Sequence, residues 1–118
     1  MIRIETLSTD NFHYINAYDG DVRVGKLGIE KIDSHKAKIV YVITDIKHIN
    51  KGIATMLMNK AIEDFGGYDL TLLVKPMPRD GENIDHRFTS GLIKFYSKFG
   101  FIRTNELLPT MIRKANTY

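Results

Sequence analysis

The 118-residue chain contains no cysteine, which excludes disulfide scaffolds, thiolate zinc sites and cysteine nucleophiles. No apolar run approaches the about 18 residues of a membrane span, and the start, Met1–Glu5, lacks the apolar stretch of an export signal. We therefore expect a cytoplasmic protein without membrane association. The net charge of +3 is too small for the dense basic surface of a dedicated nucleic-acid-binding protein.

What is present fits an ordinary globular domain. Hydrophobic residues make up 43% of the chain and charged residues 26%, both near the globular average. The length suits one domain over residues 1–118. The four histidines lack the spacing of metal ligands, so we expect no metal site.

The N-terminal half has the two-residue period of strands. Apolar and polar residues alternate in Ile2–Glu5 and Phe12–Tyr18, and Asp19-Gly20 is a strong hairpin signal before the next run, Val22–Ile32. A short helix over Ser8–Ala17 is the alternative for the second element, with Ser8 as its N-cap. The hairpin is the favoured reading.

The hydrophobic patterns of the next two runs predict a bulge in one strand and a central position for the other. Apolar residues in Val22–Ile32 change face around Gly25-Lys26, which predicts a β-bulge. The run Ala37–Thr44 is apolar on both faces. This pattern predicts a central strand that is covered on both sides.

The second half of the chain alternates helix and strand. An amphipathic pattern predicts a helix over Gly52–Phe65, ended by Gly66-Gly67 in left-handed geometry. A buried strand follows at Leu70–Val74, and a second helix is predicted over about His86 to Phe99, with Asp85 as its N-cap.

The chain after the second helix is short. Gly100 is expected to cap that helix, with Phe101 making the hydrophobic contact that usually follows such a cap. Strands are predicted near Phe101-Ile102 and Met111-Ile112. The predicted fold class is therefore mixed α/β with a largely antiparallel N-terminal sheet.

The segment Lys47–Ala54 lies between a buried strand and a helix start, where functional chemistry can be placed. A helix N-terminus carries free N–H groups and partial positive charge, and a glycine such as Gly52 lets a phosphate approach the backbone. The segment is therefore predicted to be an anion-binding turn. The structural alternative is a tight strand-to-helix turn with solvated lysines.

Three motifs in this order resemble the GNAT superfamily of N-acetyltransferases. Gly52-Ile53-Ala54, followed by Met56-Leu57-Met58, resembles the end of its acetyl-CoA signature, Gln/Arg-x-x-Gly-x-Gly/Ala. The stretch from Phe95 to Phe101 is similar to its Tyr-x-x-x-Gly-Phe motif, and Pro109–Arg113 to its closing strand. The resemblance covers roughly Val22 to Arg113.

The resemblance implies a GNAT-like fold with two main helices and a V-shaped splay between two parallel strands, Lys38–Thr44 and Leu70–Lys75. It implies acetyl-CoA as co-substrate and direct attack of a primary amine on the thioester. The residues that would contact acetyl-CoA are Val42, Ile43, Thr44, Ile49, Asn50, Lys51, Gly52, Ile53, Ala54 and Thr89.

Tyr96 occupies the position of the family's general acid, where its phenol would protonate the departing thiolate. Its alternative role is packing in the core. The general base stays open between Glu30, Asp45, His48 and a water relay.

One departure from the signature leaves other functions open. Ile49 stands where the family has Gln or Arg, so one side-chain contact to the pyrophosphate is missing. A catalytically inactive GNAT-fold interaction protein is therefore the alternative function. A small basic nucleic-acid-binding domain is the third, and it is motivated only by the basic pI and by aromatics interleaved with basic residues near Lys94 to Arg103.

The acceptor prediction rests on a short connection. Members of this superfamily usually have helices between the first two strands, whereas here only Ser8–Asn11 is available. An open site has few walls to grip a small amine, which favours a protein or peptide amine as acceptor, or a homodimer whose partner closes the site. Alternatively, the loop from Lys75 to Asp85 closes it.

Overall fold

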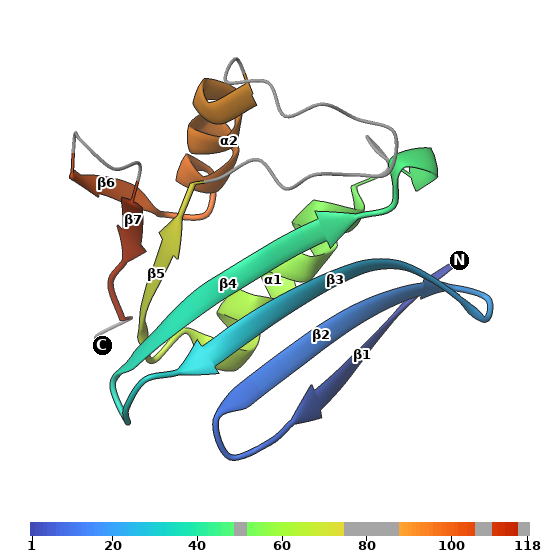
Figure 1. Ribbon diagram of the computed structural model, residues 1–118, viewed down its shortest axis with the longest axis horizontal. Coiled ribbons are helices and arrows are strands. Elements are labelled where there is room, and N and C mark those ends of the chain that lie inside the picture. Colours follow the sequence, from blue (N-terminus) through green and yellow to red (C-terminus); the bar gives the residue numbers. More distant parts are fainter. Residues whose placement is uncertain (49–51, 75–87, 106–109, 116–118) are drawn as a thin grey trace.

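A seven-stranded sheet forms the centre of the protein, in the order β1-β2-β3-β4-β5-β7-β6 (Figure 1). The computed structural model describes residues 1–48, 52–74, 88–105 and 110–115, without the side chains of residues 46, 88–90 and 105. The strands are β1 (Ile2–Ser8), β2 (Phe12–Asp19), β3 (Val22–Lys31), β4 (Lys36–Thr44), β5 (Asp69–Leu73), β6 (Ile102–Asn105) and β7 (Thr110–Arg113). The helices are the 3-10 turn η1 (Ile46–His48), α1 (Ile53–Phe65) and α2 (Phe88–Ser97).

The N-terminal hairpin prediction is confirmed, and the alternative helix over Ser8–Ala17 is wrong. β2 pairs antiparallel with β1 along its length and with β3 across the turn at Gly20-Asp21, where Gly20 has φ 63°. The alternation of apolar and polar residues in β2 favours the strand over the helix, because it buries Ile15 and Ala17 against the core.

Two bulges interrupt the ladders of β3 and β4. The first leaves Val24 unpaired opposite β2, one residue before the predicted Gly25-Lys26. The second was not predicted: Gly28 pairs with Tyr41 but Ile29 pairs with Ile39, so Val40 is the extra residue of β4. A bulge bends its strand and increases its twist.

Helix α1 covers one face of the sheet, behind β3 and β4 in Figure 1. Leu57, Met58 and Ala61 are fully buried there. A Cβ at Gly25 would lie 2.7 Å from Cγ2 of Ile53, so the absence of a side chain lets the helix approach β3 closely.

Strand β4 is central, as predicted, but it is not covered on both sides. Ile39 is buried toward α1, whereas Val40 is 36% exposed. Among the described elements, α1 packs on only one face of β4, so an apolar pattern on both faces does not require cover on both.

The helix ends agree with the predictions in part. Gly66, the C-cap of α1, is right-handed with φ −62°, and Gly67 has no positive φ, so the left-handed end predicted for Gly66-Gly67 is wrong. Gly100 is left-handed with φ 91° and Phe101 is buried, which confirms that cap, although α2 itself ends at Ser97. The predicted helix start at His86 and the N-cap at Asp85 lie outside the described residues.

The splay between the parallel strands is confirmed. β4 pairs with β5 only from Lys36 to Ile39, opposite Asp69 to Leu72. β4 continues to Thr44 while the two strands diverge, with α2 at the wide end of the V (Figure 1). The pairing ends where the Val40 bulge begins, so the bulge stands at the vertex.

Candidate active site

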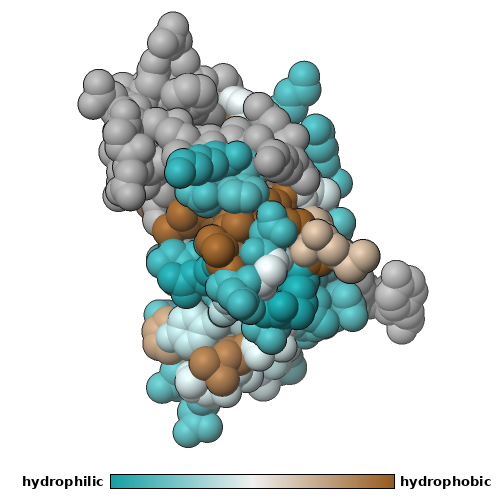
Figure 2. Space-filling view, turned by 90° about the vertical axis from the view of Figure 1, so that its right-hand side faces the viewer, coloured by the Kyte–Doolittle hydropathy of each residue, from teal (hydrophilic) through white to brown (hydrophobic). Residues whose placement is uncertain are grey.

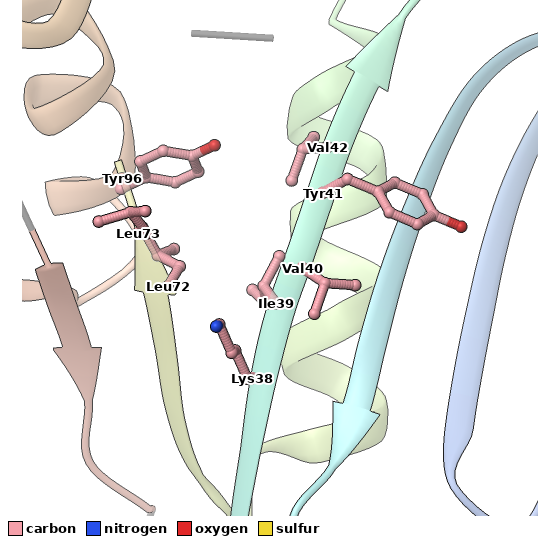
Figure 3. Close-up of a pocket in the computed structure, with 8 residues that line it drawn as sticks. All are labelled: Lys38, Ile39, Val40, Tyr41, Val42, Leu72, Leu73 and Tyr96. Carbon is pink, nitrogen blue, oxygen red and sulfur yellow. The ribbon is translucent and has the colours of Figure 1, made fainter. Parts of the chain in front are cut away.

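Two pockets meet at the splay, and Val42 and Tyr96 line both of them. The first, which we name the turn pocket, has a volume of about 340 Å³ and is lined by Val42, Thr44, His48, Gly52, Ile53, Ala54, Thr55, Leu92, Phe95 and Tyr96. The second, which we name the strand pocket, has a volume of about 260 Å³ and is lined by Lys38, Ile39, Val40, Tyr41, Val42, Leu72, Leu73 and Tyr96 (Figure 3). Their junction therefore lies between β4 and α2.

The turn at Gly52 presents an uncapped helix start to the turn pocket. Gly52 is the N-cap of α1 with φ 77°, and no side chain caps the helix. Its carbonyl accepts the first helical bond from the N–H of Met56, at 3.0 Å. The preceding N–H groups of the first turn have no helical acceptor, so they can bind an anion.

The edge of β4 that faces β5 supplies further backbone groups. From Val42 to Thr44 the strand is still paired with β3, but its pairing with β5 has ended at Ile39. Because backbone groups of a strand point alternately to either side, those directed toward β5 have no ladder partner there. They line the space between the two strands.

Tyr96 reaches from α2 into the splay. The residue is 9% exposed, and its ring packs edge-on against Phe95 and Phe101, with centroids 5.3 and 6.3 Å away. In Figure 3 the phenol oxygen points across the splay toward Val42. Burial raises the pKa of Tyr96, so the phenol is protonated at neutral pH and can donate a proton.

Asp45 forms a pair with His48, and His48 lines the turn pocket. Nδ1 of His48 lies 2.9 Å from Oδ2 of Asp45, and Nε2 lies 3.8 Å from Oδ2 of Asp19. The sequence offered both residues as separate base candidates; their spacing of three across η1 is the signal that could have paired them. Glu30, the third candidate, lines neither of these pockets.

The structure brings together seven of the predicted site residues in the turn pocket: Val42, Thr44, His48, Gly52, Ile53, Ala54 and Tyr96. Ile43 lies on β4 but lines neither pocket. Ile49, Asn50 and Lys51 lie outside the described residues, and Thr89 is in α2 with its side chain outside the description.

Several pocket residues were missed from the sequence. Leu92 and Phe95 line the turn pocket, and Leu72 and Leu73 line the strand pocket. Leu92 and Phe95 share a helix face with Tyr96, and that spacing indicates an apolar face without telling a core from a pocket wall.

Two further searches concern only the described part of the chain. Within it, no group of three or more His, Cys, Asp or Glu side chains is placed to hold a metal ion. Nor does any helix there have the length and apolar character needed to cross a membrane.

Residues 10–103 match the family described as acetyltransferase (GNAT) domain. The chain belongs to the GNAT family. A comparison with curated protein sequences gives no match.

Solved structures share this GNAT fold at low sequence identity. The ribosomal-protein-S18-alanine N-acetyltransferase from Escherichia coli is 12% identical, with a TM-score of 0.77 over 100% of this chain and 96% of that one. A GNAT family acetyltransferase from Elizabethkingia anophelis with acetyl-CoA bound is 13% identical, with a TM-score of 0.73 over 96% and 97%. The PaiA N-acetyltransferase from Thermoplasma acidophilum in complex with coenzyme A is 20% identical, with a TM-score of 0.67 over 88% of this chain. The chain spans only 61% of the length of that protein.

Proposed function

We propose that this chain is an acetyl-CoA-dependent N-acetyltransferase that moves the acetyl group to a primary amine by direct attack. The observation that carries the proposal is the meeting of two pockets at Val42 and Tyr96, one of which contains the uncapped helix start at Gly52. Family membership supports acetyl transfer. The two similar structures with coenzyme A and acetyl-CoA bound support the choice of donor.

The turn pocket is the proposed donor site. The pyrophosphate would bind the N–H groups at the start of α1, where Ile53 and Ala54 begin the helix. Ile49, Asn50 and Lys51 are its further proposed contacts. The pantetheine arm would run along the free edge of β4. There the backbone of Val42 and Thr44 would bind it, and an N–H near Val42 or Ile43 would polarise the acetyl carbonyl. Thr89 would contribute one hydrogen bond from α2.

The strand pocket is the proposed acceptor site, because it meets the donor pocket at the same two residues. The deprotonated amine attacks the carbonyl carbon, the C–N bond forms, and the C–S bond breaks. The phenol of Tyr96 gives its proton to the leaving thiolate, and the proton lost by the amine passes to solvent. The buried, protonated phenol at the junction suits this role.

The alternative is an inactive GNAT-fold interaction protein, and the observation that favours it is Ile49 in place of the signature Gln or Arg. Backbone donors depend on the geometry of the turn and not on that side chain, so Gly52 and α1 can still hold a phosphate. Among the described residues, nothing in the two pockets favours the nucleic-acid-binding alternative.

Calorimetry with acetyl-CoA tests the donor, and release of free thiol with a trial amine such as lysine amide tests turnover. We expect saturable binding in the micromolar range and amine-dependent thiol release. Binding without release would favour the inactive alternative. Absence of binding up to millimolar acetyl-CoA would contradict the proposed function.

A further inference from the structure

An aromatic row crosses the open face of the sheet, by which we mean the face opposite α1. His13 of β2 contacts α1 through Asp64 at 2.9 Å, so its neighbours Phe12 and Tyr14 point to the open face. Tyr14 pairs with Leu7 of β1 on one side and with Gly28 of β3 on the other, and Gly28 pairs with Tyr41 of β4. The aromatic row thus comprises Leu7, Phe12, Tyr14 and Tyr41.

Specific contacts hold the side chains of the aromatic row in place. The rings of Phe12 and Tyr14 stack at 6.0 Å with an interplanar angle of 12°. A Cβ at Gly28 would lie 2.5 Å from Cε2 of Tyr41, so the ring of Tyr41 lies across β3 where only glycine leaves room. Leu7 at the edge strand is 62% exposed. From the side of β1, hydrophobic residues are visible among the polar ones (Figure 2).

The aromatic row leads into the proposed acceptor site. Its last member, Tyr41, lines the strand pocket together with Val40, and Figure 3 shows Tyr41 extending from β4 on the side away from Tyr96. Across the pocket, Leu73 of β5 is 46% exposed. An apolar path therefore runs from the sheet edge to the junction of the two pockets.

Nothing in the connection of β1 to β2 covers this face, because that connection is only residues 9–11. Tyrosine-rich surface with exposed aliphatic neighbours is typical of protein-binding sites, where tyrosine is enriched among the residues that dominate affinity.

Positive charge accompanies the row. The ammonium of Lys26 lies 5.5 Å from the ring centroid of Tyr41. Arg23 of β3 pairs with Tyr18 of β2, which has the same parity as Phe12 and Tyr14, so Arg23 also points to the open face. Within the described residues, Arg23, Lys26 and the pocket residue Lys38 are in no ion pair with a carboxylate. The same face also carries Glu30, opposite Lys38 in the ladder, and Glu5, which pairs with Arg3. Arg23 and Lys26 are therefore the positive charges that this face offers to an acidic partner.

We propose that the aromatic row is the docking surface for an acidic polypeptide segment, whose primary amine enters the strand pocket. This inference rests on the proposed function and adds the class of acceptor. Aromatic and aliphatic side chains of the segment pack on Tyr14 and Tyr41, while its carboxylates pair with Arg23 and Lys26. A second copy of this chain is less suited as occupant, because two such faces would bring like charges together.

The test uses two fluorescent peptides of equal length, each with one lysine and two phenylalanines, one carrying four glutamates and the other four glutamines. Fluorescence anisotropy measures their binding to the protein. The acidic peptide is expected to bind at least about 10-fold more tightly. Lys26→Gln should weaken its binding about 3-fold, and Tyr14→Ser should weaken the binding of both peptides. With acetyl-CoA, the acidic peptide should also be the better acceptor.

Lys60→Gln is the matched control, since Lys60 lies on α1 on the other side of the sheet, paired with Glu63 and Asp64. Equal affinity for the two peptides, or equal weakening by Lys60→Gln and Lys26→Gln, would overturn the inference. So would self-association of the protein that Tyr14→Ser abolishes. Calorimetry with acetyl-CoA distinguishes failure of this inference from failure of the proposed function. Absence of acetyl-CoA binding would contradict the proposed function. Binding of acetyl-CoA without preference for the acidic peptide would contradict only this inference.

Discussion

At the scale of single residues, Tyr96 connects burial to chemistry. Its ring packs on Phe95 and Phe101 like a core residue, and its hydroxyl lies at the junction of two pockets like a catalytic one. The two interpretations made from the sequence are therefore compatible, because packing holds the ring and leaves its oxygen toward the splay (Figure 3).

Tyr96→Phe separates these two roles. The variant keeps the ring and removes the proton donor, so turnover should fall about 10- to 100-fold or more while acetyl-CoA affinity stays nearly unchanged. Steady-state kinetics and calorimetry measure the two effects. Tyr68→Phe, a phenol that packs on Phe65 at the end of α1, is the control and should keep full turnover. If the rate of the chemical step is unchanged in Tyr96→Phe, the acid role is contradicted and only the packing role of Tyr96 remains.

The pH dependence of turnover reports the same phenol. Burial raises the pKa of Tyr96 above its ordinary value of about 10. The acid form is therefore present at neutral pH and is lost only as the pH rises through that raised pKa. A profile of kcat against pH should show no loss attributable to Tyr96 below about pH 10. A decline near pH 8 to 9 that disappears in Tyr96→Phe would contradict this.

Gly52 offers a test of the phosphate site. Because φ is 77°, any side chain there strains the backbone, and Asn and Asp tolerate this region best. Gly52→Asn and Gly52→Asp should therefore cost similar stability, about 1 to 2 kcal/mol each in denaturant unfolding. Only Asp places a negative charge beside the phosphates. Gly52→Asp should bind acetyl-CoA at least about 10-fold more weakly than Gly52→Asn. Equal affinities of the two variants would contradict a phosphate site at Gly52.

At the scale of elements, periodicity predicted the strands and helices well where one face is buried. Alternation identified β2 because Ile15 and Ala17 must reach the core. It could not reveal the Val40 bulge, since β4 is apolar on both faces and a change of register leaves no trace in such a pattern. The right-handed backbone of Gly66 could not be predicted either, because glycine permits both the right-handed and the left-handed conformation.

Two glycines are expected to respond in opposite ways to substitution by alanine. A Cβ at Gly25 meets Ile53 at 2.7 Å and the backbone oxygen of Ile43 at 3.3 Å, so Gly25→Ala should lower the free energy of unfolding by about 1 to 3 kcal/mol. At Gly91, inside α2, a Cβ meets nothing within 4 Å, and Gly91→Ala should raise it by about 0.5 to 1 kcal/mol. Denaturant unfolding measures both, and destabilisation by Gly91→Ala with none by Gly25→Ala would contradict the packing.

At the scale of the whole molecule, the sequence pointed to the fold through three motifs in order, and the structure confirms the splayed sheet that they imply. The Gly52 turn and Tyr96 could be named because they stand in those motifs. The contact of His48 with Asp19 could not, since Asp19 belongs to a hairpin far away in the sequence. The open face likewise depends on strand register, which no motif encodes.

The central claim is that one continuous site joins the helix start at Gly52 to the phenol of Tyr96. A crystal structure with acetyl-CoA bound tests it most directly. The account predicts the pyrophosphate on the N–H groups that begin α1 and the thioester sulfur within hydrogen-bonding distance of the Tyr96 oxygen. A pyrophosphate bound away from Gly52, or a sulfur atom that the Tyr96 hydroxyl does not reach, would contradict it.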